Sequence, residues 1–276
     1  MAAAISSAHP LAMQQLRSAD DGGVSAAPVE LPQHGPRVAQ KPDDATPARS
    51  AVVAERHELF MLAAMAYMAV EWKERPEIGG PIAAIVAWNV SDITRTPRFV
   101  IDRNRSRSRE NGTYHAEISA IHKAYQAKPK GVRWKGWLAN TTLYATLEPC
   151  LMCAATMPVQ HIPRAEYCME DPSIRAAEKP DRPRKHPVPT EYHGRKFAMQ
   201  PSSLGRCARL NATIWRRVDG ARKNGSREFR FFTYLRNNVD TLFGPSVRAL
   251  ASRKATYRQN AELLQNLRTA VRSGGD

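Results

Sequence analysis

A chain of 276 residues, 42% of them hydrophobic, is long enough to bury the core of at least one domain. The most apolar window, residues 59–70, is too short for a membrane span, and the N-terminus lacks the pattern of a secretory signal. The net charge of +15 is concentrated in residues 171–276, which carry 22 basic and 9 acidic side chains. That excess favours a polyanionic partner such as nucleic acid, and a solvated arginine-rich surface is the plainer alternative.

The cysteines are too few for a disulfide framework in a chain of this length. They stand at positions 150, 153, 168 and 207, and the first two form a C-x-x-C pair. In a reducing compartment such a pair indicates metal or redox chemistry more often than a disulfide. We therefore expect a cytoplasmic protein without a membrane partner, in which Cys168 and Cys207 are ordinary buried thiols.

The first half of the chain begins with a segment that lacks a sustained apolar period. Residues 1–50 are rich in Ala, Ser, Pro and Gln, so we expect a disordered tail. A broad apolar face then predicts a helix over 51–73, which Pro76 ends. The apolar run 81–88 predicts a strand, and 98–102 a second strand antiparallel to it.

The middle of the chain alternates between helices and strands. After a polar loop, the apolar pattern predicts a helix over 115–127, a strand over 142–146, a helix over 150–157 and a strand over 165–169. The order is β-β-α-β-α-β behind a leading helix. We therefore expect an α/β domain in which one sheet is covered by helices on both faces.

The last third differs in composition. Residues 172–195 are proline-rich and basic, which predicts a loop. The aromatic and basic residues of 229–236 fit base stacking, but we favour a half-buried strand there. From Val247 to Gly274 the apolar steps predict one long amphipathic helix. The expected organisation is a tail over 1–50, a core over 51–171 and a basic extension over 172–276.

Three residues have the chemistry of a catalytic metal site. Zinc prefers four tetrahedral nitrogen and thiolate ligands, and catalytic sites leave one position open. His115, Cys150 and Cys153 supply three, and Pro149 suits the start of a helix that carries the two thiolates. A redox pair or a structural zinc site are the alternatives. The latter requires a fourth ligand, for which His122 and His161 are the nearest candidates.

Glu117 adds a proton carrier to this set. It lies two residues beyond His115, on the first turn of the same predicted helix. From there it can take a proton from water and pass protons to a ring nitrogen and to departing ammonia. Together the two segments match the pattern H-x-E…P-C-x-x-C of zinc-dependent base deaminases.

The sequence around these motifs shows a more specific resemblance. The stretches His115-Ala-Glu-Ile and Leu143-Tyr-Ala-Thr-Leu-Glu-Pro-Cys-Leu-Met-Cys153 resemble the cytidine and deoxycytidylate deaminase superfamily, on the branch that holds bacterial tRNA adenosine deaminase and guanine deaminase. The resemblance implies a three-layer sandwich with a mixed sheet of about five strands, bound Zn²⁺ and a homodimer. It also implies substrate contacts by Asn104, Ala116 and Pro149.

Four arginines alternate with small residues just before the predicted catalytic helix. Arg103, Arg105, Arg107 and Arg109 are able to bind phosphates if they lie at the mouth of the pocket, or else they form a flexible surface loop.

The sequence therefore predicts a zinc-dependent hydrolytic deaminase of a nucleobase, acting on tRNA or another single-stranded nucleic acid. A deaminase of a free base, nucleoside or small metabolite is the first alternative. A non-catalytic zinc module that binds nucleic acid or protein is the second, and an intact Glu117 argues against it.

Overall fold

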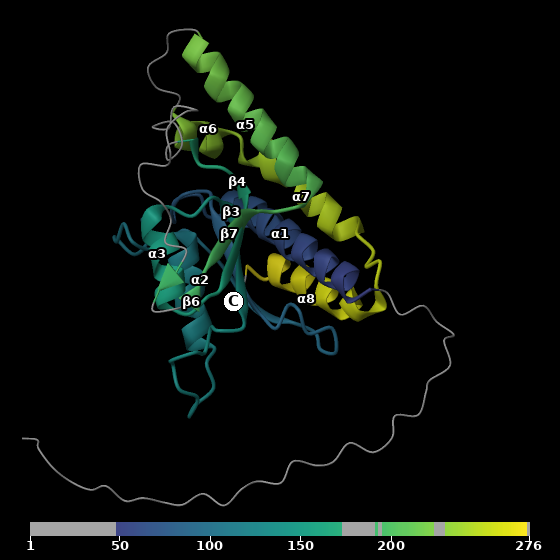
Figure 1. The fold of residues 1–276 in the computed structure, drawn as a ribbon. Coiled ribbons are helices and arrows are strands. Elements are labelled where there is room, and N and C mark those ends of the chain that lie inside the picture. The colour runs from purple at the N-terminus through teal and green to yellow at the C-terminus, as the bar shows by residue number, and fades with distance from the viewer. Residues whose placement is uncertain (1–47, 173–190, 193–194, 224–229, 275–276) are drawn as a thin grey trace, which may run out of the picture. The chain divides into compact units, whose positions relative to one another are not determined.

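A computed structural model describes residues 48–172, 191–192, 195–223 and 230–274 (Figure 1). Contacts divide the chain into residues 1–45 and 46–276, and every described residue belongs to the second unit. The expected disordered tail, apart from its last three residues, and most of the proline-rich loop lie outside the described residues.

The elements follow the predicted order through residue 169. In chain order they are α1 (Arg49–Glu74), β1 (Ala83–Trp88), β2 (Arg98–Arg103), α2 (Ala116–Gln126), β3 (Thr141–Leu147), α3 (Leu151–Val159), β4 (Arg164–Met169), β5 (Glu191–Tyr192), β6 (Arg195–Lys196), β7 (Ala198–Pro201), α5 (Gly205–Lys223), α6 (Phe231–Asn237), α7 (Val239–Ser252), the 3₁₀ turn η1 (Arg258–Asn260) and α8 (Ala261–Arg272).

One mixed sheet forms the centre of the fold. Its strands run in the order β2-β1-β3-β4-β7, with β1 antiparallel to β2 and β3, and with β3, β4 and β7 mutually parallel. Helices α2 and α3 lie on one side of it, and α1, α7 and α8 on the other (Figure 1). The predicted three-layer α/β fold with a five-stranded mixed sheet is confirmed.

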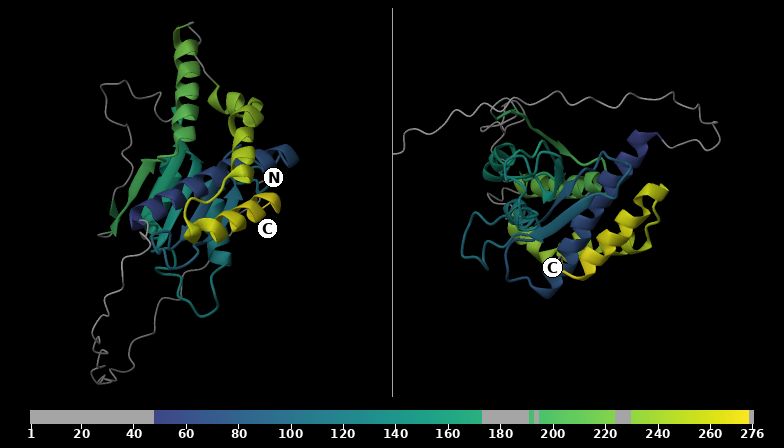
Figure 2. Two further views of the ribbon diagram at one scale, coloured as in Figure 1. Left: turned by 90° about the vertical axis from the view of Figure 1, so that its right-hand side faces the viewer. Right: turned by 90° about the horizontal axis from the view of Figure 1, so that it is seen from below.

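Burial follows from this layering. Every residue of β1 and β3 is buried, because helices cover both faces of the sheet. Helix α1 is itself enclosed, since it packs against β1 and β3 on one side and against α7 and α8 on the other (Figure 2). Its apolar residues therefore extend around most of the helix rather than along one stripe.

The single long C-terminal helix predicted by the sequence is wrong. Helix α7 ends at Ser252, and the chain reaches α8 only after a break, so both helices pack against α1. Two sets of hydrogen bonds hold the break. The guanidinium of Arg268 donates to the carbonyls of Leu250, Ala251 and Arg253. The carboxylate of Glu55, on α1, accepts from the backbone amides that follow, those of residues 256 and 257.

The predicted strand over 229–236 is also wrong, because its described part forms helix α6. Phe231 and Leu235 are buried and stand four residues apart, which places them on one face of a helix. Phe232 remains 38% exposed. The period of four, rather than the alternation of aromatic and basic residues, determines the structure here.

Cys168 and Cys207 are not free thiols. They form a disulfide between β4 and α5, across 39 residues of sequence. The spacing carries no local pattern, so the pairing depends on how α5 packs against β4. Within the described residues, no helix combines the length and the apolarity needed to cross a bilayer.

Candidate metal centre and active site

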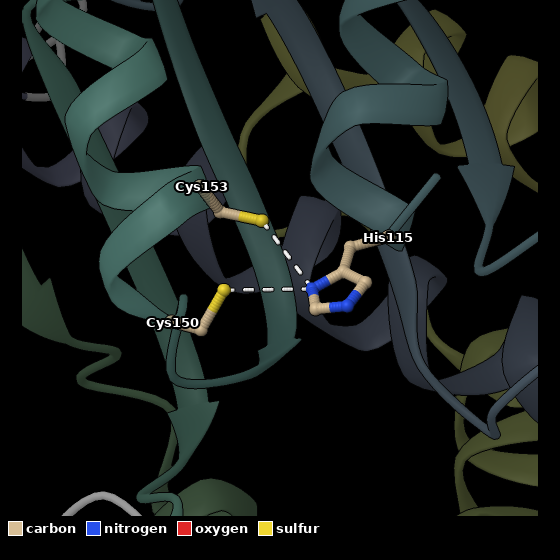
Figure 3. Close-up of side chains that lie close together, drawn as sticks. All are labelled: His115, Cys150 and Cys153. Atoms are coloured by element: carbon tan, nitrogen blue, oxygen red, sulfur yellow. Dashed lines mark hydrogen bonds between the residues drawn. The ribbon is translucent and has the colours of Figure 1, made fainter. Parts of the chain in front are cut away.

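Two helix N-termini bring three candidate ligands together (Figure 3). His115 is the N-cap of α2, Cys150 is the N-cap of α3, and Cys153 lies in the first turn of α3. The Nδ1 atom of His115 is 3.5 Å from the sulfur of Cys150 and 3.6 Å from that of Cys153. All three ligand atoms lie within 4.8 Å of one another.

These distances fit zinc. Tetrahedral bonds of about 2.1 Å to nitrogen and about 2.3 Å to sulfur imply a nitrogen-to-sulfur distance of about 3.6 Å. Within the described residues no further His, Cys, Asp or Glu joins the group, and this includes His122 and His161. The donor set therefore offers three ligands and leaves one tetrahedral position for water or substrate, as in catalytic rather than structural zinc sites.

The cluster holds one thiol with a lowered pKa and two ligands with raised pKa values, whose protons a bound cation would displace. The hydrogen bond from Cys153, followed by the one to His115, lowers the pKa of the Cys150 thiol to about 4. The same hydrogen bond and burial raise the pKa of Cys153, because two adjacent sulfurs share one proton. The hydrogen bond to Cys150 raises the pKa of His115. Both helix N-termini add positive potential, which favours thiolate.

Glu117 is the buried acid of this site. Its side chain is 4% exposed, and burial raises its pKa to about 7, with a further contribution from the negative charge of Cys150. A carboxyl group that titrates near neutral pH both accepts and donates protons readily. Burial thus gives Glu117 the property that a general acid–base group requires.

A comparison with known proteins decides the family. Residues 54–169 match the model of the cytidine and deoxycytidylate deaminase zinc-binding region. A tRNA-specific adenosine deaminase of Agrobacterium fabrum is 35% identical over 125 residues, which are 44% of this chain and 74% of the relative. The chain belongs to the cytidine and deoxycytidylate deaminase family. The resemblance predicted from the motifs is confirmed, and this family member is a hydrolytic deaminase of nucleobases.

Solved structures of this deaminase family are also similar. One comes from a study of A-to-I editing by tRNA:A34 deaminases and is 27% identical, covering 51% of this chain and 95% of that one, with a TM-score of 0.35. A guanine deaminase from Bacillus subtilis is 25% identical, covering 49% and 85%, also with a TM-score of 0.35.

Asn104 lies at the end of β2 with its amide group available. Its Oδ1 accepts hydrogen bonds from the backbone and hydroxyl of Ser106, at 3.0 and 2.7 Å. Its Nδ2 has no hydrogen-bond partner in the described part of the chain. The backbone of Gly79 comes so close that a Cβ there would stand 2.2 Å from the carbonyl oxygen of Asn104. Only glycine allows this approach, and the free Nδ2 keeps Asn104 a predicted substrate contact.

Ala116 and Pro149 border the ligands in sequence. Ala116 is fully buried at the first position of α2, directly after His115. Pro149 is buried immediately before Cys150. Their predicted contacts with substrate stay a prediction.

Among the four arginines, the phosphate-binding role predicted for Arg103 is wrong. This last residue of β2 is fully buried, and its Nη1 donates to the carbonyls of Glu71 and Arg75, both at 2.8 Å. Its guanidinium lies 5.8 Å from the ring of Trp72. The side chain therefore holds the end of α1 instead of facing solvent.

The other three arginines lie on the loop between β2 and α2. Arg107 and Arg109 are exposed, and Arg105 is half-buried with its Nε 2.8 Å from Asp102. Sequence reasoning missed two neighbours of this loop, Ser119 and Lys123. They stand four and eight residues after His115, so the helical period was a signal that could have identified them.

Proposed function

We propose that this protein is a zinc-dependent hydrolytic deaminase that acts on a base of tRNA or of another single-stranded nucleic acid. The observation that carries the reaction is the cluster of His115, Cys150 and Cys153 with the buried acid Glu117 beside it. The substrate class is supported by the relative named a tRNA-specific adenosine deaminase. It is further supported by the basic excess in residues 171–276.

Each residue of the cluster then has a role. His115, Cys150 and Cys153 would hold zinc, whose Lewis acidity, when it is bound, makes water a nucleophile near neutral pH. Glu117 accepts a proton from water as the oxygen bonds to the amino-bearing ring carbon. It passes this proton to the ring nitrogen, then accepts the second proton from the new hydroxyl group as that group becomes a carbonyl, and delivers it to the amino group, which departs as ammonia when its carbon–nitrogen bond breaks.

Other groups position the substrate. We assign Asn104 to orient the base through its free Nδ2, with the backbone around Ala116 and Pro149 lining the pocket. A base taken from a strand must be unstacked before it can enter. The exposed arginines before α2 are suited to the phosphates of that strand. We further propose a homodimer and a cytoplasmic location, the latter because tRNA substrates occur there; the Cys168–Cys207 disulfide removes the argument from free thiols.

The test is ammonia release by the zinc-loaded protein. Total tRNA would be compared with free cytosine, guanine and adenine compounds. Glu117→Gln should lower turnover by about 10²- to 10⁴-fold, the usual contribution of general acid–base catalysis, while zinc content stays at the wild-type level. Glu77→Gln, at an exposed position outside the site, is the matched control and should retain wild-type turnover.

Each outcome separates one function from another. Release from tRNA alone supports the proposal, and release from one small molecule makes the protein a metabolic deaminase. Zinc binding without release from any substrate favours a non-catalytic zinc module. Near-normal turnover in Glu117→Gln would exclude Glu117 from the mechanism.

A further inference from the structure

A hollow of about 290 Å³ lies between the loop before α2 and the outer face of α2 itself. The residues that matter for its chemistry are Arg105, Arg109, Tyr114, Ser119, His122 and Lys123. Ser119, His122 and Lys123 belong to α2, and the mechanism proposed above uses none of them.

The hollow lies along the helix that begins at the candidate ligand His115, and Tyr114, which directly precedes His115, lines it. Ser119, His122 and Lys123 follow His115 by four, seven and eight residues, so they continue along the same side of α2. At the rise of an α-helix, Ser119 stands about 6 Å and Lys123 about 12 Å along the axis from His115. A group bound in the hollow would therefore lie about 6 to 12 Å along α2 from the candidate ligand His115.

The net charge of the hollow favours an anionic ligand. Arg105, Arg109 and Lys123 oppose one carboxylate, Asp102, which leaves a net charge of +2 with the imidazole of His122 not counted. Asp102 accepts from Nε of Arg105 at 2.8 Å, and Arg109 lies 5.9 Å from the ring of Tyr114. The ammonium group of Lys123 has no ion-pair or hydrogen-bond partner among the described residues. Two of the three cations are thus free to bind a ligand.

Ser119 supplies an independent indication. Its side chain is 3% exposed, and its hydroxyl has no hydrogen-bond partner among the described residues. A buried hydroxyl left without a partner costs about 1 to 3 kcal/mol, and Ser119 carries the one such hydroxyl among the described side chains; the other buried side-chain atoms without a partner are nitrogen atoms of Arg103, Arg164 and Arg253. An oxyanion oxygen would accept a hydrogen bond from this hydroxyl, and the cations that line the hollow would balance its charge.

We propose that this hollow is a phosphate subsite, which holds the phosphate of the nucleotide that carries the target base or of its neighbour in the strand. The inference deepens the proposed function and depends on it for the identity of the ligand. A free base has no phosphate, so the subsite would favour nucleotides and polynucleotides over free bases.

The experiment compares substrates that differ in phosphate. The zinc-loaded full-length protein would be tested with a short single-stranded RNA, the corresponding nucleoside 5′-monophosphate and the nucleoside. Lys123→Gln should lower the ratio of kcat/KM for the RNA to that for the nucleoside by about tenfold, which is typical of one charge-assisted hydrogen bond. Inorganic phosphate should compete with RNA for the wild type more strongly than for the variant.

Two controls separate binding from folding. Lys73→Gln, at an exposed position on α1, should leave that ratio unchanged. Ser119→Ala removes an unpartnered hydroxyl, so its melting temperature should equal or exceed that of the wild type, while its affinity for RNA falls. For Lys123→Gln, the slope of log Kd for RNA against log salt should decrease by about 0.7, the value for one phosphate contact on a single strand.

The outcomes are distinct. A loss seen with the monophosphate and the RNA assigns the subsite to the target nucleotide's own phosphate, and a loss seen with RNA alone assigns it to a neighbour. RNA turnover with unchanged ratios and salt slope in both variants would overturn the subsite and leave the proposed function intact. Phosphate-dependent RNA binding without ammonia release would support the subsite and refute the proposed function.

Discussion

Two buried polar clusters of this deaminase, one around Arg56 of α1 and one at the N-termini of α2 and α3, differ in what their hydrogen bonds do. On the α1 side, Arg56 is fully buried and donates to four acceptors, the side chain of Asn260 and the carbonyls of Val90, Asp92 and Arg95. On the α2–α3 side, two thiols and an imidazole bond to one another, and the buried carboxyl of Glu117 lies beside them. The bonds of Arg56 hold the loop after β1 and the segment before α8 against α1, whereas the ligand atoms of the cluster can exchange their mutual bonds for bonds to a cation.

The difference also shows in which pKa values change and why. On the α1 side the carboxylate of Glu55 accepts bonds from Asn260 and from two backbone amides, and its pKa is lowered despite the opposing effect of burial. On the other side burial dominates and raises the pKa of Glu117 to about 7. Hydrogen bonds outweigh burial at Glu55, whereas burial outweighs hydrogen bonds at Glu117.

The largest expected effect comes from removing a ligand. Cys153→Ala should lose zinc and reduce ammonia release by more than 100-fold, since changes in outer-shell residues alone already cost about 10- to 100-fold. Metal content by elemental analysis, together with turnover, tests this. The chain should still fold, because Cys153 is a buried site that alanine tolerates, and an intact circular dichroism spectrum is the control. Retained stoichiometric zinc would contradict the three-ligand site.

A stability defect of intermediate size should follow from Arg56→Met. The change leaves four acceptors without their donor, and the expected cost is about 3 to 5 kcal/mol of unfolding free energy. Arg49→Met, on the same helix, is the matched control, because exposed Arg49 bonds, among the described residues, only to the carbonyl of Ser91 and should cost less than about 1 kcal/mol. Denaturant unfolding measures both. A loss of zinc by folded Arg56→Met protein would show that the two layers are coupled.

The smallest effect should be a loss of stability in acid that depends on His57. Burial lowers its pKa to about 4, with Arg164 contributing, and Tyr144 contacts its Nδ1 at 2.7 Å. Glu166 lies 3.1 Å away but also binds Arg164 at 2.6 Å, so burial dominates. The unfolded chain binds the proton more readily than the folded one. The contribution of neutral His57 to the unfolding free energy is therefore complete above about pH 6.5 and is lost toward pH 4.

The expected loss is at most about 3 kcal/mol between pH 7 and pH 4. It would be measured as the difference between wild type and His57→Gln, because carboxylates elsewhere titrate in the same range and cancel in that difference. Glutamine keeps a hydrogen-bonding group near Tyr144 but does not titrate. Identical pH profiles for the two proteins would show that His57 is accessible to protons in the folded state.

Local sequence determined the elements and the ligands of the candidate site. The alternation of apolar runs predicted the helices and strands from residue 49 to 169, because those periods are set by the geometry of each element. The ligand set followed from the ligand preferences of zinc and from the match to the pattern H-x-E…P-C-x-x-C of zinc-dependent base deaminases. His115 and Cys150 each stand at a predicted helix start, and the C-x-x-C spacing keeps both sulfurs at that start.

Tertiary structure decided the features that depend on residues far apart in the sequence. Arg268 and Glu55 break the expected long helix into α7 and α8, and no local period encodes that contact. The burial of Arg103 against the end of α1 removed one arginine from the expected phosphate-binding set. The hollow beside Ser119 exists only because the loop before α2 folds against that helix. Such contacts lie beyond sequence patterns, because a period describes one element whereas burial depends on which elements meet.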